Sequence, residues 1–194
     1  MGKRIVCLLL IISCLLLTGC GDSKSVISTD IDTYTRDCES VENASVLMPD
    51  LADLGAYTEL KYTYQETTEG VIFTTRGLAL FVKYDQETYN KQKADALSAH
   101  IFLEESVMDD EGDHYIIPCT EFEYKGYLMM IVPDDDFTFS PCKSFMMLGF
   151  NDETCVITYL YHYSQDLDFI AEKDQDLNAE MVSFVDRYFS WVDL

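Results

Sequence analysis

The chain has 194 residues, with 35 acidic side chains against 13 basic ones and a net charge of −22 at pH 7. This excess of negative charge excludes a nucleic-acid-binding role and disfavours anionic lipid surfaces, because both would repel the protein. It favours cationic ligands or protein partners, and the length is that of one domain with a core of its own.

The first twenty residues have the pattern of an export signal. A short basic segment precedes thirteen residues, 5–17, in which only Ser13 is polar. A membrane-spanning helix needs about 20 apolar residues, so this run has instead the length of the apolar region of a signal peptide. Two small residues then lead to Cys20.

The segment LTGC, residues 17–20, resembles the lipobox of bacterial lipoproteins. The resemblance implies a signal peptide over residues 1–19, cleavage before Cys20, and a diacylglycerol joined to the Cys20 thiol through a thioether. The alternatives are a plain signal peptide or an uncleaved N-terminal anchor. A lipidated chain would be held on the extracytoplasmic face of a cell membrane. Without the two basic residues of the signal, 11 basic residues face 35 acidic ones, a net charge of −24.

Four cysteines would remain in the mature chain besides Cys20. In an exported protein they could form two disulfides, with three connectivities, or stay as free thiols. No CxxC spacing occurs, which removes the main support for a zinc ribbon or a thioredoxin-like site. The four candidate disulfide cysteines are Cys38, Cys119, Cys142 and Cys155.

The mature chain divides by composition into a polar segment and a globular domain. Residues 20–45 are rich in Ser, Thr and Asp without an apolar period, which predicts a flexible tether with a reach of about 25–30 Å. Residues 46–194 form the domain. Strands are expected at residues 57–65 and 77–85, with a turn over ETTEG between them, and a helix capped by Asp85 at residues 85–100.

The second half of the domain predicts more strands and a final helix. Residues 116–133 form two strands joined through Lys125 and Gly126, and residues 142–163 form a hairpin around Asn151. The last segment carries apolar residues at helical spacing, with acids at its start that suit a helix N-terminus. The expected fold is α+β, a largely antiparallel sheet of about six strands with two helices on one face.

Catalytic motifs are missing from the sequence. No G-x-S-x-G, H-E-x-x-H, Walker A or G-x-G-x-x-G pattern occurs, and His100, His114 and His162 have the contexts of surface or strand-edge histidines. A dyad of His162 with Cys119 or Cys155 is the remaining nucleophilic arrangement, although both thiols lie in apolar strands. Paired acids at 121 and 123 would share the solvent face of one strand.

Calcium is the sharpest alternative to a simple acidic surface, because oxygen ligands cluster in three segments. The cluster at residues 174–178, the third along the chain, has Asp, Asp and Asn at alternate positions. It lacks the glycine and the glutamate of an EF-hand, so helix capping is the simpler role. We therefore predict no metal and no cofactor. The clusters are residues 109–114, 134–136 and 174–178.

Three further segments, MPDLADLGAY, FEYKGY and KSFMMLGFNDE, are similar to segments of small acidic lipoproteins of anaerobic Gram-positive bacteria. The similarity implies a surface location and transfers no site residue. The sequence thus predicts a lipid-anchored protein with a non-enzymatic binding role. An enzyme of the cell envelope with an unrecognised site and a calcium-stabilised surface module are the alternatives.

Overall fold

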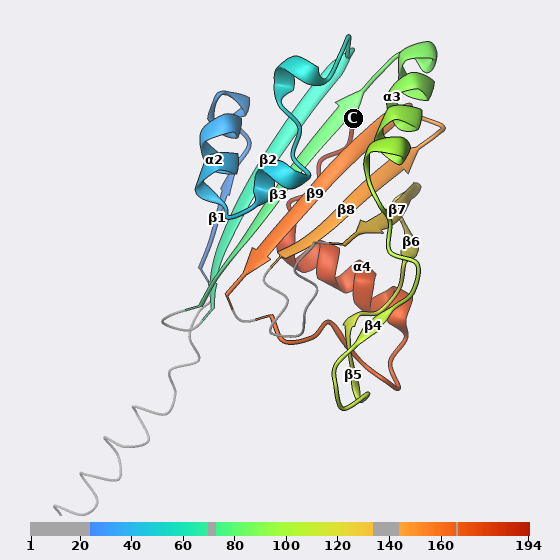
Figure 1. Ribbon diagram of the computed structural model, residues 1–194. Coiled ribbons are helices and arrows are strands. Elements are labelled where there is room, and N and C mark those ends of the chain that lie inside the picture. Colours follow the sequence, from blue (N-terminus) through green and yellow to red (C-terminus); the bar gives the residue numbers. More distant parts are fainter. Residues whose placement is uncertain (1–23, 70–72, 134–143, 166) are drawn as a thin grey trace, which may run out of the picture.

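The computed structural model describes residues 24–69, 73–133, 144–165 and 167–194, which form an α+β domain (Figure 1). Seven antiparallel strands make the main sheet, in the order β1-β2-β3-β9-β8-β7-β6. Their bounds are β1 Lys24–Ser28, β2 Glu59–Glu69, β3 Phe73–Lys83, β6 Glu121–Tyr124, β7 Tyr127–Val132, β8 Ser144–Asn151 and β9 Val156–Ser164. A smaller sheet, in the order β10-β5-β4, contains β4 Val107–Met108, β5 His114–Ile117 and β10 Ala171–Glu172.

Two meanders build the main sheet. The first runs through β1, β2 and β3, and the second returns from the far edge through β6, β7, β8 and β9 to pair with β3. The helix α3, Gln86–Ala99, and the strands β4 and β5 of the small sheet connect the two meanders. The other helical segments are η1 Ile31–Thr33, α2 Tyr34–Ser40, η2 Ala44–Val46, η3 Leu51–Asp53 and α4 Leu177–Tyr188.

Local signals in the sequence explain several of these boundaries. Asp85 accepts a hydrogen bond from the Thr88 backbone at 2.8 Å and begins α3, as predicted. Lys125 and Gly126 both have positive φ and turn β6 into β7. Asn151 accepts hydrogen bonds from the two backbone N–H groups at positions 153 and 154, which closes the β8–β9 hairpin.

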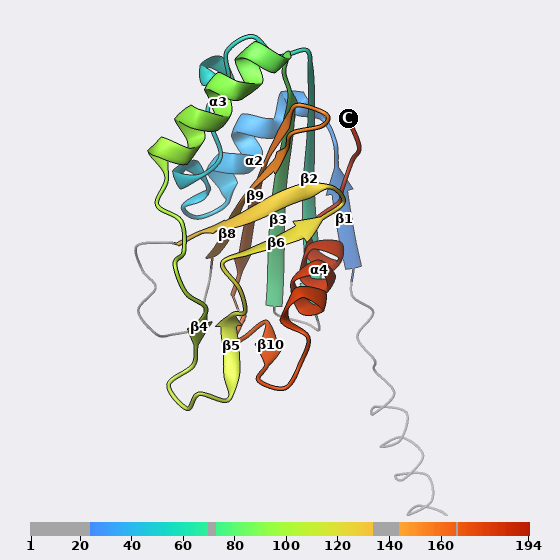
Figure 2. The same ribbon diagram turned by 90° about the vertical axis from the view of Figure 1, so that its right-hand side faces the viewer.

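The prediction of two helices on one face is wrong, because α3 and α4 cover opposite faces of the sheet (Figure 2). On β3, Leu78, Leu80 and Val82 point to the front face, which carries α2 and α3, whereas Ala79 and Phe81 point to the back face, which carries α4. A strand that is apolar on both sides needs cover on both sides. The main sheet also has seven strands rather than about six.

The prediction of a flexible tether is wrong for residues 24–45. The strand β1 pairs with β2 along its whole length, and α2 packs on the front face. Tyr34, Val41 and Ala44 are at most 3% exposed. The described part of the domain therefore includes β1 from Lys24, four residues after Cys20, and Cys20 and the predicted signal peptide lie outside the described residues. Within the described ranges, no helix is long and apolar enough to cross a membrane.

Candidate functional site

A row of polar side chains crosses the front face of the sheet near the start of β1. Glu66 on β2 pairs with Arg76 on β3, Arg76 pairs with Tyr163 on β9, and Tyr163 pairs with Ser144 on β8. Directly paired residues of an antiparallel sheet point to the same face, so the four side chains lie side by side. The next rows along the strands are filled mainly by apolar and tyrosine side chains.

Hydroxyl and guanidinium donors converge on two acids, Glu66 in this row and Glu42 outside it. Arg76 Nε donates to Glu66 Oε2 at 3.0 Å, and the Tyr64 hydroxyl donates to the same oxygen at 2.8 Å. The Tyr163 hydroxyl donates to Glu42 Oε2 at 3.0 Å. The chain before β2 therefore supplies one acid, and three strands of the sheet supply the other partners.

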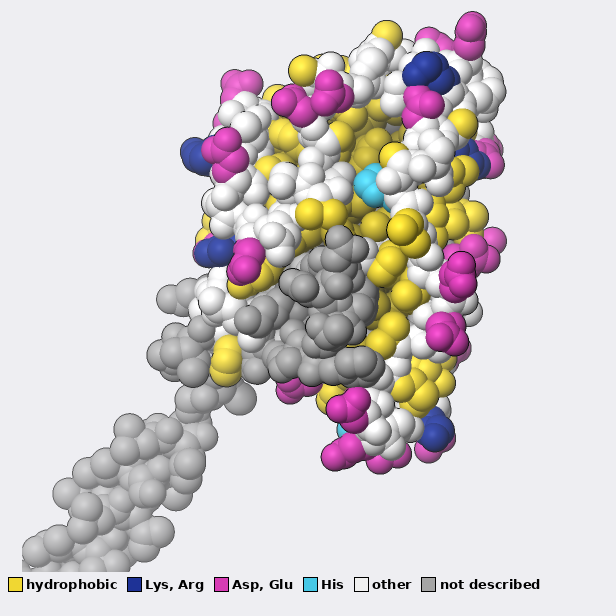
Figure 3. All heavy atoms as spheres, viewed as in Figure 1, with side chains coloured by type: hydrophobic (Ala, Val, Ile, Leu, Met, Phe, Trp, Pro, Cys, Tyr) yellow, Lys and Arg dark blue, Asp and Glu magenta, His cyan; other side chains and the backbone are white. Residues whose placement is uncertain are grey.

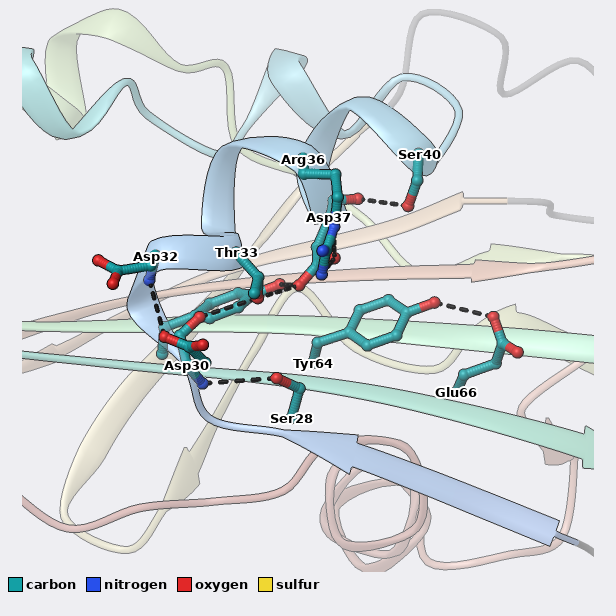
Figure 4. Close-up of polar contacts among 10 residues, drawn as sticks. Ser28, Asp30, Asp32, Thr33, Arg36, Asp37, Ser40, Tyr64 and Glu66 are labelled. Atoms are coloured by element: carbon teal, nitrogen blue, oxygen red, sulfur yellow. Dashed lines mark hydrogen bonds and ion pairs between the residues drawn. The ribbon is translucent and has the colours of Figure 1, made fainter.

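Asp37 on α2 extends the arrangement. Asp37 is 7% exposed, and its carboxylate accepts hydrogen bonds from the Thr33 hydroxyl at 2.5 Å, from Arg36 at 3.0 Å and from the Tyr62 hydroxyl at 3.4 Å. Figure 4 shows this carboxylate directed toward the sheet, beside Tyr64. We call the whole group the tyrosine–carboxylate cluster: Asp37, Glu42, Tyr62, Tyr64, Glu66, Arg76 and Tyr163.

The charges of this cluster are set by its hydrogen bonds and its burial. The hydrogen bond from Arg76 lowers the pKa of Glu66, so that this carboxylate stays ionised at neutral pH. Burial raises the pKa of Tyr64 to about 12 and also raises the pKa of Tyr62, so both phenols stay protonated donors. None of these tyrosines serves as a base at neutral pH. The cluster can therefore recognise a ligand by hydrogen bonds and charge.

Two features adjoin the cluster. Apolar side chains gather on the front face between α2 and α3 (Figure 3). A surface pocket of about 520 Å³ opens at the edge of β2, beyond the end of β1. Its lining includes Ile31, Leu60, Lys61, Tyr62, Val192 and Asp193.

The sequence did not identify the tyrosine–carboxylate cluster. The segment ETTEG was predicted as a turn, but β2 continues through Glu66 to Glu69. The alternation of Tyr62 and Tyr64 extends in phase to Glu66 and Thr68, and this is the signal that could have placed Glu66 on the front face. Asp37 was missed because its segment was assigned to the tether.

The three described candidate cysteines lie at different places in the fold. Cys38 packs on the front face and Cys119 on the back face, while the Cys155 thiol lies 3.3 Å from the Gln86 side-chain oxygen. These three thiols form no disulfide with one another. Burial raises the pKa of Cys38 and of Cys119 to about 11. The fourth candidate, Cys142, lies outside the described residues.

His162 is not a strand-edge residue. It lies on β9 in the middle of the sheet with no exposed surface, and neither ring nitrogen has a hydrogen-bond partner among the described residues. Its ring packs against Phe184 at 4.9 Å and Tyr188 at 4.6 Å between ring centroids. Burial lowers its pKa to about 3, so the ring is neutral. The structure does not join it to Cys119 or Cys155 in a dyad.

The other two histidines occupy different surroundings. His100 ends α3, and partial burial lowers its pKa. His114 on β5 forms an ion pair with Asp109 at 2.7 Å between Nδ1 and Oδ2, and the hydrogen bond that its ring donates to this carboxylate raises the His114 pKa.

The acid clusters have local roles where they are described. Asp109 accepts hydrogen bonds from the backbone at positions 113 and 114, and Asp176 caps α4 by accepting from Asn178 and Ala179. The described residues contain no group of three or more potential metal ligands. The second cluster, residues 134–136, lies outside the described ranges. Glu121 and Glu123 point to solvent on β6, as predicted.

Comparisons with protein family models, with curated proteins and with solved structures gave no match to this chain.

Proposed function

We propose that this chain is a lipid-anchored protein of the extracytoplasmic face of a cell membrane, with its lipid on Cys20 and a non-enzymatic binding role. The observation that carries the proposal is the segment LTGC at residues 17–20, directly after the apolar run 5–17. Thiolate chemistry explains why a cysteine is needed, because sulfur is the nucleophile that accepts the lipid.

One diacylglycerol is sufficient to hold the protein on a membrane. Each buried CH₂ group contributes about 0.8 kcal/mol, and stable attachment needs two acyl chains, which one diacylglycerol supplies. The start of the domain at Lys24 is compatible with this role, because cleavage before Cys20 would leave every described strand and helix intact.

The binding role is supported by the tyrosine–carboxylate cluster and by the charge of the mature chain. The cluster combines protonated phenols with ionised Glu66 at a half-buried surface, which suits a ligand that donates and accepts hydrogen bonds. The net charge of −24 left after cleavage favours a cationic ligand or a basic surface of a protein partner.

The anchoring proposal is tested by intact mass spectrometry of the protein from its native membrane fraction. We expect the mass of residues 20–194 plus diacylglycerol, and unprocessed, unlabelled precursor for Cys20→Ala. Cys14→Ala is the matched control, since it changes a cysteine of the same signal without touching the cleavage site. Normal processing of Cys20→Ala would show an ordinary signal peptidase site and overturn the proposal.

The binding role is tested by cross-linking in intact cells with a reagent that joins carboxylates to amines. The double variant Tyr64→Phe with Glu66→Gln removes two members of the cluster, and Tyr57→Phe with Glu59→Gln makes the same changes near the other end of β2. We expect the first variant alone to lose a cross-linked product. An unchanged set of products in both variants would contradict a role for the cluster.

A further inference from the structure

We infer that one corner of the domain, formed by the start of β1 and the adjoining ends of β2 and β3, lies against the lipid surface of the membrane. Val26, Ile27 and Phe73 are the contacting side chains. This inference rests on the proposed anchor at Cys20, and it assigns the surface through which the anchored domain meets the bilayer.

The length of chain between anchor and domain carries the first step. Lys24 is the first residue of β1 and follows Cys20 by four residues. Fully extended, four residues span at most about 14 Å. A flexible tether over residues 20–45 would have reached about 25–30 Å and allowed the domain to turn freely. With β1 built into the sheet, the anchor instead holds one corner of the domain close to the membrane.

The pairing of the strands shows which side chains share this corner. Lys24 pairs with Thr68 on β2, and Phe73 on β3 pairs with Glu69, the next residue of β2. Neighbouring strands are about 4.8 Å apart, so Phe73 lies roughly 10 Å to the side of the first residue of β1. It is within the area that the short connection brings to the membrane.

Three apolar side chains are exposed at this corner. Val26 is 63% exposed, Ile27 55% and Phe73 39%. Val26 pairs with Glu66 and Ile27 with Gln65, so the two side chains project from opposite sides of the edge strand. Exposed apolar side chains beside a membrane anchor gain free energy by entering the boundary between headgroups and acyl chains.

The charges of the molecule favour the same orientation. The sequence has no charged residue between Glu69 and Arg76, and Arg76 is paired with Glu66. The acidic segment 109–113 lies at the opposite side of the sheet from β1, beside β5 (Figure 1). A domain tilted onto its β1 corner therefore keeps this acidic segment away from the lipid headgroups.

The test compares two positions at opposite ends of the same strand pair. Phe73→Trp and Tyr57→Trp each replace an exposed aromatic residue, 39% and 45% exposed, in the lipidated chain. The eleven residues of β2 separate these ends by about 33 Å. Each variant, isolated from membranes and checked by intact mass, is reconstituted into phosphatidylcholine vesicles with or without brominated phosphatidylcholine, which quenches tryptophan on contact.

We expect the tryptophan at position 73 to lose roughly half of its fluorescence in brominated vesicles, because it would lie among the lipids. The tryptophan at position 57 should not be quenched. Native Trp191 is present in both variants, and the wild type measures its contribution. A third variant carries a Gly/Ser insertion of about 20 residues after Gly21, which restores a long tether and should abolish the quenching at position 73.

The outcomes separate this inference from the proposed function. Equal quenching at both positions in protein of lipidated mass would overturn the orientation and leave the anchor in place. Quenching that survives the insertion would also overturn it, because the short connection would not be its cause. A mass without lipid would remove the proposed function itself.

Discussion

A Cβ atom built on Gly77 would lie 2.1 Å from the carbonyl oxygen of Tyr188, so the end of α4 rests directly on the backbone of β3. Gly77 pairs with His162, whose ring packs against Tyr188 and Phe184. The close approach of two backbones, rather than an unusual φ, is what requires glycine at this position. It allows α4 to cover the buried histidine.

Gly77→Ala should therefore displace the end of α4. The clash is with a backbone oxygen, which cannot turn away as a side chain can, and we expect the free energy of unfolding to fall by about 1–3 kcal/mol. Urea denaturation followed by circular dichroism measures the loss. Thr74→Ala, three residues earlier on β3, is the control and should change stability much less. An unchanged midpoint for Gly77→Ala would contradict the packing of α4 on β3.

His162 should make the folded state sensitive to acid. Its pKa is about 3 in the folded protein and near 6.5 when unfolded, so below pH 6.5 the unfolded chain binds the additional proton. The free energy of unfolding should fall as the pH decreases from 6.5 toward 3, by up to about 1.4 kcal/mol per pH unit from this residue. His162→Leu should lack this component, and the difference between the two unfolding curves from pH 7 to pH 5 isolates it from the carboxylates.

His114 provides a control, because its contribution to the free energy of unfolding should depend on pH in the opposite direction. Its hydrogen bond to Asp109 raises its pKa, so its contribution to stability is present at low pH and is lost as the pH rises through the folded-state pKa. The variant His114→Gln should therefore approach the wild type as the pH increases. If the free energies of unfolding of wild type and His162→Leu changed in parallel with pH, the buried ring would not be responsible for the loss of stability in acid.

Much of the sheet could be predicted because its signals are local. Asp85 at the start of α3, Asn151 in the β8–β9 turn and the Lys125-Gly126 turn each act within four residues of the chain. A short-range hydrogen bond or a positive φ has the same effect whatever the rest of the fold does. These elements were therefore found from residue types alone.

The parts that were missed depend on contacts distant in the sequence. The seven residues of α2 are too few for an apolar period, and Tyr34 is buried because Tyr62 lies 5.1 Å away on a strand that follows much later. The side of the sheet that α4 covers follows from Gly77 and His162, and no local pattern near residue 180 contains that information. The tyrosine–carboxylate cluster was missed for the same reason.

Asp37 should be the acid of α2 that matters for stability. Its carboxylate is buried and accepts hydrogen bonds from Thr33, Arg36 and Tyr62, so Asp37→Asn places an amide where the donors need an acceptor. We expect a loss of about 1–3 kcal/mol in the free energy of unfolding. Asp32→Asn, at an exposed position five residues earlier, should change it little. Equal effects of the two substitutions would contradict the docking of α2 on the sheet and would favour a loose N-terminal segment.

Trp191 should anchor the C-terminal segment on the back face. Its ring contacts Phe81, Tyr124 and Tyr127 edge-on at 4.8–5.0 Å between centroids, and the segment is also held by side chains of β2, whose Thr63 hydroxyl donates to the Ser190 carbonyl at 2.8 Å. Removing the ring in Trp191→Ala opens a cavity among these aromatics, and we expect a loss of about 3 kcal/mol.

Trp191→Phe separates the packing of this ring from its polar atom. The buried indole Nε1 has no hydrogen-bond partner in the part of the chain that the structure describes. An unpaired donor costs free energy in the wild type, and phenylalanine removes that cost while keeping most of the apolar contact. The loss for Trp191→Phe should therefore stay below about 1.5 kcal/mol, because phenylalanine leaves a much smaller cavity than alanine does. Both values come from urea denaturation followed by circular dichroism, because tryptophan fluorescence is lost in these variants. If Trp191→Phe were as damaging as Trp191→Ala, the indole nitrogen would have to make a contact that aromatic packing does not replace, and the C-terminal segment would be held by that contact instead.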